Sequence, residues 1–310
     1  MEVLHETNIT GIGEKKAGKV RDIYDLGDKL ILITTDRHSS FDRHLADIPH
    51  KGQVLNQVSA WWFEKTKDIV PNHVLAVPDP NVTVAKKYKT VPVEAVMRGY
   101  LTGVTDTAIW TRYQKGQRKY GDILLPDGLQ KNTKLPQPLF DPTTKEETHD
   151  RAITPEEMIA EGLITRELFE KVKDTATKLF LRGQEIAAKQ GLILVDTKYE
   201  FGVDEKGELV LIDEIHTPDS SRYWQLLSFR ERQLRGEEPE YFDKEFLRLW
   251  FKKHSDPYKD ATLPPAPQEL VEEMSRRYIQ MYEQITGAAF NAGQQPVIPR
   301  IENNLRPYAI

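Results

Sequence analysis

The sequence feature that most constrains the fold is a long, mainly apolar stretch that turns back on itself. Residues 192–199 and 209–215 are both rich in strand-forming side chains. Between them, residues 204–207 read Asp-Glu-Lys-Gly, a composition typical of a turn. We therefore expect an antiparallel β-hairpin at this point of the chain.

The charged side chains of this hairpin are expected to share one face. Alternation along the first strand places Asp196, Lys198 and Glu200 together. A four-residue turn pairs Lys198 with Asp213 and brings Asp213 to the same face. Glu200 and Asp213 are then diagonal neighbours about 7–8 Å apart at the backbone, so that two carboxylates can bind one hard cation. The alternative is a solvated charged face; the polar cluster that continues through residues 214–222 favours the metal site.

The rest of the chain mixes strands and helices. Further strands are expected at residues 19–24, 29–35, 82–85 and 93–97, and helices at residues 56–69, 155–162, 167–189, 244–253 and 268–285. A polar excursion is expected at residues 115–150 and an extended tail at residues 288–310.

These elements do not alternate regularly, which favours an α+β fold over a doubly wound α/β fold. We expect two lobes with the active site in the cleft between them. The smaller, β-rich lobe would comprise residues 1–95, and the larger, mixed lobe residues 96–310.

Composition excludes several classes of function. The formal net charge is −5 and no long basic run occurs, which argues against nucleic acid as a partner. The 310 residues include no cysteine, so disulfides, thiolate metal sites and cysteine nucleophiles are absent. No signal pattern and no apolar run of about 20 residues predicts a membrane segment. We expect a cytoplasmic protein with no membrane partner; a homo-oligomer stays open.

The hairpin and the segments after it resemble the SAICAR synthetase family. The resemblance rests on Asp-x-Lys-Tyr-Glu-Phe-Gly at residues 196–202, Ile-Asp-Glu at 212–214 and Thr-Pro-Asp-Ser-Ser-Arg at 217–222, and it extends from Gly18 to about Trp224. It implies a ligase of purine biosynthesis that uses ATP with Mg²⁺. The substrates would be small molecules: carboxyaminoimidazole ribonucleotide, L-aspartate and ATP. The carboxylate would be activated as an acyl phosphate and then attacked by the aspartate amine.

The resemblance also assigns roles within the hairpin region. It implies that Glu200 and Asp213 bind the Mg²⁺ carried with ATP, and that Asp196, Asp219 and Arg222 face the imidazole ribonucleotide. Lys198 lies between the acids and would limit the negative charge of the catalytic centre.

A Gly-Lys pair near the N-terminus is a second candidate site. Gly18, Lys19 and Arg21 lie just before a predicted strand. By itself this segment is not a phosphate-binding P-loop, and a turn beside an exposed lysine is the simpler interpretation. The resemblance implies instead that it covers the ATP phosphates, as the glycine-rich lobe of kinases does.

Two further segments complete the predicted site. After the strand at 29–35, the resemblance makes Asp36, Arg37 and Ser39 candidates for lining the substrate cleft. It also places Arg98 against the substrate phosphate, where a guanidinium can bind two oxygens at once. The family commonly has serine where this chain has Val104, which has no hydroxyl group.

Two other functions compete with the ligase. A kinase-like phosphotransferase would need a catalytic base and a metal-binding asparagine in His-Arg-Asp order, which Asp-Arg-His at residues 36–38 does not supply. A non-catalytic nucleotide- or metal-binding regulator would not be expected to retain both metal acids, the phosphate lysine and the substrate arginines.

Overall fold

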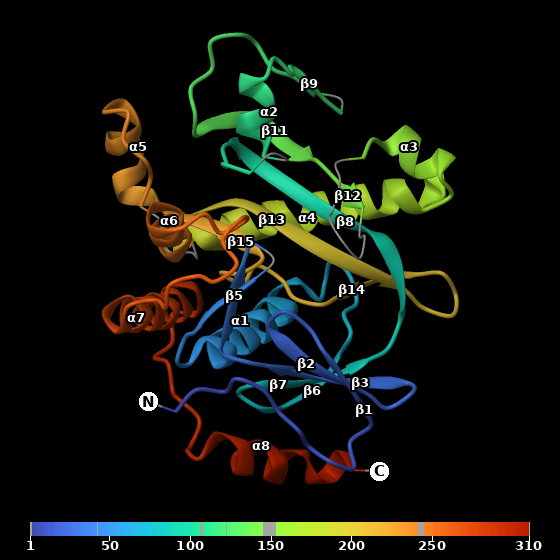
Figure 1. Ribbon diagram of the computed structural model, residues 1–310. Helices are drawn as coiled ribbons and strands as arrows, with labels where there is room; N and C mark the ends of the chain where they lie inside the picture. Colours follow the sequence, from blue (N-terminus) through green and yellow to red (C-terminus); the bar gives the residue numbers. More distant parts are fainter. Residues whose placement is uncertain are drawn as a thin grey trace.

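The computed structural model describes residues 2–41, 43–105, 108–121, 123–144, 153–240 and 245–309. Figure 1 shows helices packed on two separate sheets, and this arrangement confirms the α+β class. Within the described residues, no helix is both long and apolar enough to cross a membrane.

The first sheet is built from the N-terminal part of the chain. Its antiparallel strands run in the order β1-β2-β3-β7-β6. Their bounds are Glu14–Ala17 (β1), Arg21–Asp25 (β2), Lys29–Thr34 (β3), Val74–Asp79 (β6) and Val82–Lys86 (β7). A separate hairpin of β4 (Arg37–Ser40) and β5 (Arg43–Asp47) follows β3 and leads into helix α1 (Lys51–Thr66).

Alternation along β3 places the first sheet between two helices. Ile31 and Ile33 belong to an apolar core that also contains Val297 and Ile301 of helix α8 (Val297–Leu305). The intervening Leu32 points to the opposite face, where α1 packs. Figure 1 shows α8 below this sheet and α1 above it.

The second sheet holds the predicted acidic hairpin. Its strand order is β11-β8-β13-β14, with β12 paired to β8 and β15 paired to β13. The bounds are Lys89–Leu101 (β8), Thr133–Phe140 (β11), Thr143–Thr144 (β12), Leu192–Val203 (β13), Leu209–Ile212 (β14) and Ser221–Gln225 (β15). The boundary expected between residues 95 and 96 falls inside β8.

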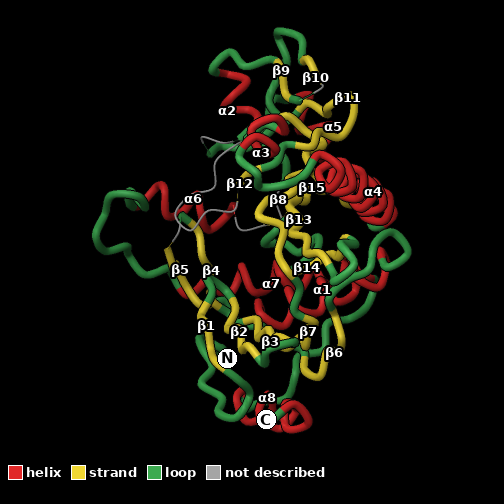
Figure 2. The backbone as a smooth tube through the Cα atoms, turned by 90° about the vertical axis from the view of Figure 1, so that its right-hand side faces the viewer, coloured by secondary structure: helices red, strands yellow, loops and turns green. Residues whose placement is uncertain are grey.

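One face of the second sheet is apolar and packs against helix α4 (Arg166–Lys189). Val93 and Ala95 of β8 share this core with Tyr199 and Phe201 of β13. Glu94 and Glu200, which lie between them in sequence, therefore point to the other face, which is polar in this part of the sheet. Figure 2, a view turned by 90°, also shows α4 beside this sheet.

Several further elements complete the fold. They are α2 (Ile109–Gln114), β9 (Lys119–Tyr120), β10 (Ile123–Leu124), α3 (Pro155–Ala160), α5 (Leu226–Leu234), α6 (Glu245–His254), α7 (Gln268–Thr286) and a 3₁₀ turn, η1 (Arg306–Tyr308). The expected start of α3 is confirmed: Thr154 and Glu157 form a reciprocal capping box. Part of the expected polar excursion, residues 145–150, lies outside the described residues.

Two expectations from the sequence were wrong. The C-terminal tail is not extended throughout, because Val297, Ile301 and Leu305 recur at helical spacing and are buried on the first sheet. The predicted hairpin register was also wrong by one residue: Val203 pairs with Leu209, and Glu200 pairs with Ile212.

The register error has a local cause in the turn. Asp204 accepts hydrogen bonds from the amides of Lys206 and Glu208, at 2.8 Å each, so the loop includes Glu208. The paired part of β14 ends at Ile212, and Asp213 has a left-handed φ of 68°. Asp213 therefore leaves the ladder, and its position is set by the turn that follows β14.

Candidate active site

Two glutamates and one lysine form the centre of the polar face. Glu200 on β13 lies directly opposite Glu94 on β8. Lys198 donates hydrogen bonds to both, at 2.9 Å to Glu94 Oε1 and 2.8 Å to Glu200 Oε1. Burial alone would lower the pKa of Lys198, but Glu200, Asp213 and Glu94 outweigh burial and raise its pKa well above the ordinary value. The lysine is therefore a fixed cation among acids.

A second cation reaches the same acids from the first sheet. Arg21, at the start of β2, forms an ion pair with Asp213 and lies 3.2 Å from Glu214 Oε1. Burial opposes its charge, but Asp213 and Glu214 raise the pKa of Arg21 above its ordinary value. Burial raises the pKa of Glu214. The two sheets thus meet where the phosphate segment and the acidic hairpin were both predicted to act.

The donor set of this cluster fits a hard divalent cation. Glu94, Glu200, Asp213 and Glu214 supply four carboxylates, and their partners Lys198 and Arg21 supply two cations, which leaves two negative charges in the group. Oxygen ligands with excess negative charge are what Mg²⁺ prefers. The predicted ladder position of Asp213 was wrong, yet Asp213 and Glu200 both act on Lys198 and on Arg21.

The substrate residues predicted around β13 are also brought together. Asp196 is paired in register with Arg98 on β8 and with Arg222 on β15. Arg222 Nη1 donates to Asp196 Oδ2 at 2.7 Å, and Arg98 Nε donates to Asp141 Oδ2 at 2.6 Å. Asp141 was missed from the sequence, since it lies in the segment that was expected to be a polar excursion.

Gly103 lies at the edge of this arginine pair. Its φ is +103°, and an added Cβ would come within 2.6 Å of Ala108 Cβ and 3.3 Å of Arg222 Nη1. A side chain here would be strained and would crowd the guanidinium. The glycine therefore gives the chain after β8 a close approach to Arg222.

Asp219 is held by two residues that sequence reasoning did not assign. Lys51 Nζ lies 2.7 Å from Asp219 Oδ2, and the Tyr278 hydroxyl donates to Asp219 Oδ1 at 2.6 Å. The Lys51 side chain is completely buried at the start of α1, and Tyr278 lies on α7. Tyr278 carries no local signal, because on α7 it occupies an ordinary apolar position of an amphipathic helix.

Arg37 supports the predicted phosphate segment from within the protein. It donates to the carbonyl oxygens of Gly18 at 3.0 Å and Lys19 at 3.3 Å, and to Asp22 Oδ1 at 2.9 Å. Gly18 and Lys19 themselves are exposed. These partners of Arg37 all lie within the protein, and its predicted role in lining the substrate cleft stays a prediction.

Asp36 also has internal partners. Its carboxylate accepts from the amides of Leu4 at 2.8 Å and Gly52 at 2.9 Å. Burial raises the pKa of Asp36 to about 6, although the amide donors act against this shift. Asp36 therefore joins the N-terminal segment to α1, and its predicted role in lining the substrate cleft stays a prediction. Ser39 lies nearby on β4, half-buried and opposite His44.

Comparisons with known sequences agree over most of the chain. The family model for SAICAR synthetase matches residues 14–265. A phosphoribosylaminoimidazole-succinocarboxamide synthase of Legionella pneumophila (strain Paris) is 58% identical over 305 residues, which cover 98% of this chain and 97% of that protein. The chloroplastic protein of that name from Arabidopsis thaliana is 54% identical over 97% of this chain and 75% of its own length.

Solved structures give the same result for the fold. A SAICAR-synthase from Saccharomyces cerevisiae, complexed with SAICAR, superposes with a TM-score of 0.80 at 31% identity and covers 93% of this chain and 100% of that one. A SAICAR synthetase (Type-2) in complex with ADP has a TM-score of 0.69 at 26% identity, with 90% and 100% covered. This chain belongs to the SAICAR synthetase family.

Proposed function

We propose that this chain is a phosphoribosylaminoimidazole-succinocarboxamide synthase. It joins L-aspartate to the carboxylate of 5-amino-1-(5-phospho-D-ribosyl)imidazole-4-carboxylate and gives SAICAR, ADP and phosphate in purine biosynthesis. Similarity to proteins of that name over nearly the full chain supports this activity. The observation that carries the proposal is the contact of Arg21, beside the Gly-Lys segment, with Asp213 and Glu214 beside the acidic hairpin.

The acidic cluster would hold Mg²⁺ together with the ATP phosphates. Glu200 and Asp213 are the proposed ligands, and Lys198 limits their mutual repulsion. Mg²⁺, when bound there, would neutralise phosphate charge and act as a Lewis acid. Gly18, Lys19 and Arg21 would cover the phosphates, and the ATP anion would then replace the carboxylates as the partner of Arg21.

The paired arginines would bind the imidazole ribonucleotide. Arg98 and Arg222 flank Asp196 on neighbouring strands, and both can offer a planar fork of N–H donors to a phosphate. Asp196 and Asp219 would face the polar groups of the nucleotide. Because Lys51 and Tyr278 hold Asp219, its orientation is fixed before substrate binds.

The chemistry is amide formation from a poor electrophile. A substrate carboxylate oxygen attacks the γ-phosphorus of ATP, the bond to the bridging oxygen breaks, and ADP leaves. The aspartate amine then attacks the acyl carbon, phosphate leaves, and the amine loses a proton. The protein aligns the reactants, and Lys198 and Arg21 stabilise the negative charge that develops. The proposed partners are thus small molecules. The proposal also includes a cytoplasmic location and an active site in a cleft between the two sheets.

ADP release by the purified chain tests this activity. Release should require the imidazole ribonucleotide and L-aspartate together, with SAICAR formed in equal amount as measured by mass spectrometry. ATP hydrolysis without aspartate, or phosphate transfer to a protein, would refute the ligase.

A further inference from the structure

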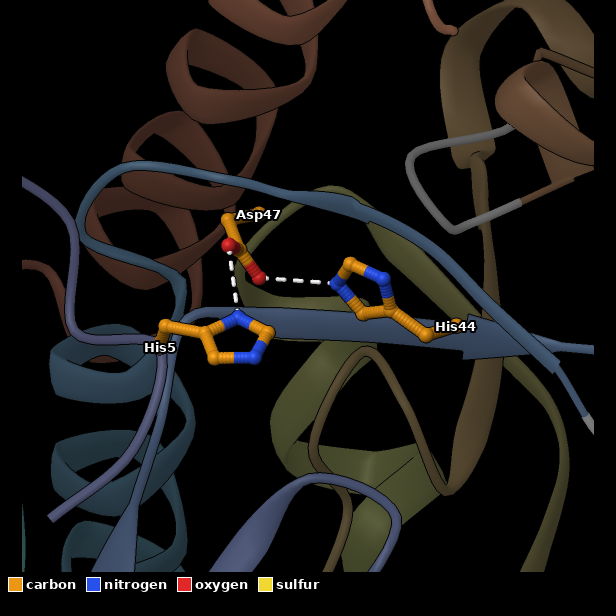
Figure 3. Close-up of side chains that lie close together, drawn as sticks. All are labelled: His5, His44 and Asp47. Carbon is orange, nitrogen blue, oxygen red and sulfur yellow. Dashed lines mark hydrogen bonds and ion pairs between the residues drawn. The ribbon is translucent and has the colours of Figure 1, made fainter. Parts of the chain in front are cut away.

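A cluster of two histidines and one aspartate lies on the surface of the β4–β5 hairpin. His5 Nδ1 lies 2.8 Å from Asp47 Oδ2, and His44 Nε2 lies 2.8 Å from Asp47 Oδ1. One potential ligand atom from each side chain lies within 4.8 Å of the other two. Figure 3 shows both imidazoles turned toward the carboxylate, which is the convergence that a metal site requires.

A bulge in β5 makes this convergence possible. His38 pairs with Ala46, but the next residue, Ser39, pairs with His44, so Leu45 is an extra residue in the ladder. In a regular strand, residues three apart point to opposite faces. The extra residue shifts the alternation and brings His44 and Asp47 to the same side.

His5 is brought to the pair by the backbone of the N-terminal segment. The Leu4 amide donates to Asp36 at 2.8 Å, and the His5 carbonyl oxygen accepts from Arg37. Both partners are buried, so the segment is fixed on either side of the imidazole. The backbone positions of the three residues are therefore set by contacts that do not involve their ligand atoms.

We propose that His5, His44 and Asp47 bind a divalent cation of the Zn²⁺ type. Two imidazoles with one carboxylate suit borderline metals, whereas Mg²⁺ prefers oxygen ligands alone. Donors around a tetrahedral ion with bonds of about 2.0 Å lie about 3.3 Å apart. This spacing falls between the 2.8 Å histidine–carboxylate contacts and the 4.8 Å within which the three ligand atoms all lie. The side chains are 56%, 45% and 22% exposed, which leaves a fourth position to water or to an external ligand.

This cation site is distinct from the proposed ATP–Mg²⁺ site. The latter consists of carboxylates on β8, β13 and the turn after β14. Arg37 links the two regions, because it holds the His5 carbonyl oxygen as well as that of Gly18. A cation bound to His5 would thus help to hold Arg37 in place. Arg37 in turn supports Gly18 and Lys19 of the proposed phosphate-binding segment.

Titration calorimetry with Zn²⁺ tests the proposal, with Mg²⁺ present in excess and no nucleotide. The chain has no cysteine, so no thiolate competes for the metal. We expect one Zn²⁺ per chain and at least about tenfold weaker binding in His5→Ala, His44→Ala and Asp47→Asn, because even indirect partners of a metal are worth that much. His254→Ala is the matched control: this exposed histidine bonds the Trp250 carbonyl on α6 and should leave the affinity unchanged.

Unchanged Zn²⁺ affinity in His44→Ala, or an equal loss in His254→Ala, would show that the cluster is a hydrogen-bonded surface group only. Thermal unfolding without metal checks that each variant is folded. NMR of the histidine-labelled wild type tests the site without any substitution: one equivalent of Zn²⁺ should shift the imidazole signals of His5 and His44 and leave that of His254 in place. Both readouts are independent of ligase activity.

Discussion

Arg21 and Asp213, which lie 192 positions apart in the sequence, form an ion pair that joins the first sheet to the second. One comes from the start of β2, and the other from the left-handed turn after β14. Under the proposed roles, in which Arg21 binds the ATP phosphates and Asp213 binds Mg²⁺, this ion pair would have to open when ATP and Mg²⁺ bind.

Replacement of either proposed metal ligand should abolish most of the activity without unfolding the protein. We expect Glu200→Gln and Asp213→Asn to lower kcat by about 10²–10³-fold, as loss of one electrostatic contact to the transition state does. Removal of one acid also relieves repulsion within the cluster, so circular dichroism should show a folded chain. Glu205→Gln, in the exposed turn, is the control. An unaltered Mg²⁺ dependence would contradict the assignment.

Loss of Arg222 should mainly weaken the binding of the imidazole ribonucleotide. Charge-assisted hydrogen bonds contribute about 1.5–3 kcal/mol, so Arg222→Ala should raise the KM for this substrate by roughly 10–150-fold. The KM for ATP should change much less. Arg235→Ala, an exposed arginine at the end of α5, is the matched control. Equal KM values in the variant and the wild type would mean that Arg222 serves only its ion pair with Asp196.

Removal of one hydroxyl group should separate the positioning of Asp219 from the stability of α7. Tyr278→Phe keeps the buried ring but deletes the 2.6 Å hydrogen bond to Asp219. Since Lys51 still holds the other oxygen, we expect a loss of only about 0.5–1.5 kcal/mol in the free energy of unfolding. The KM for the ribonucleotide should rise, as measured by ADP release. If it stays constant while stability falls, Asp219 does not contact the substrate.

The buried imidazole of His216 should make stability depend on pH. Burial lowers the pKa of His216 to about 3, against 6.5 for an ordinary histidine. As pH falls below 6.5 the unfolded chain binds a proton that the folded chain does not, so this group opposes folding increasingly down to about pH 3. The slope is about 1.4 kcal/mol per pH unit for one proton. Asp36, whose folded pKa of about 6 lies above its ordinary 3.8, acts in the opposite direction over that range.

Denaturant unfolding at several pH values measures this effect. His216→Leu should reduce the pH dependence between about 3 and 6.5 by close to one proton. The control His254→Ala, at an exposed position, should retain the wild-type slope. A slope that is the same in His216→Leu and the wild type would mean that His216 can be protonated in the folded protein.

The C-terminal helix should contribute to the core of the first sheet. Ile301 is completely buried, and its truncation to alanine should cost about 2–5 kcal/mol in the free energy of unfolding. Glu302→Ala, one position further on and exposed, should change it by less than about 0.5 kcal/mol. Similar values for the two variants would show that α8 does not stabilise the sheet.

Features that depend on a local sequence pattern could be predicted. Alternation identified the polar face of β13, and Lys198 and Glu200 do lie there in hydrogen-bond contact. The capping box identified the start of α3 because both of its partners lie within one helical turn. The roles of Glu200, Asp213 and the arginines came from family resemblance, and they stay proposals at the level of single residues.

Features set by distant or irregular contacts could not be predicted in this way. The position of Asp213 depends on a turn one residue longer than expected and on a left-handed φ. Asp141, Lys51 and Tyr278 reach the site only through pairings across 43, 168 and 59 positions of sequence. The bulge at Leu45, likewise, has no signal in a sequence read with a period of two residues.

The position of α8 has a consequence for how this protein is made. The strands of the first sheet leave the ribosome before α8, but their core also needs Val297, Ile301 and Leu305 of that helix. In Figure 1 the two ends of the chain lie on the same side of the molecule, next to this helix. The core of the first sheet therefore cannot be completed before α8 has been synthesised, although all five strands of the sheet precede that helix in the chain.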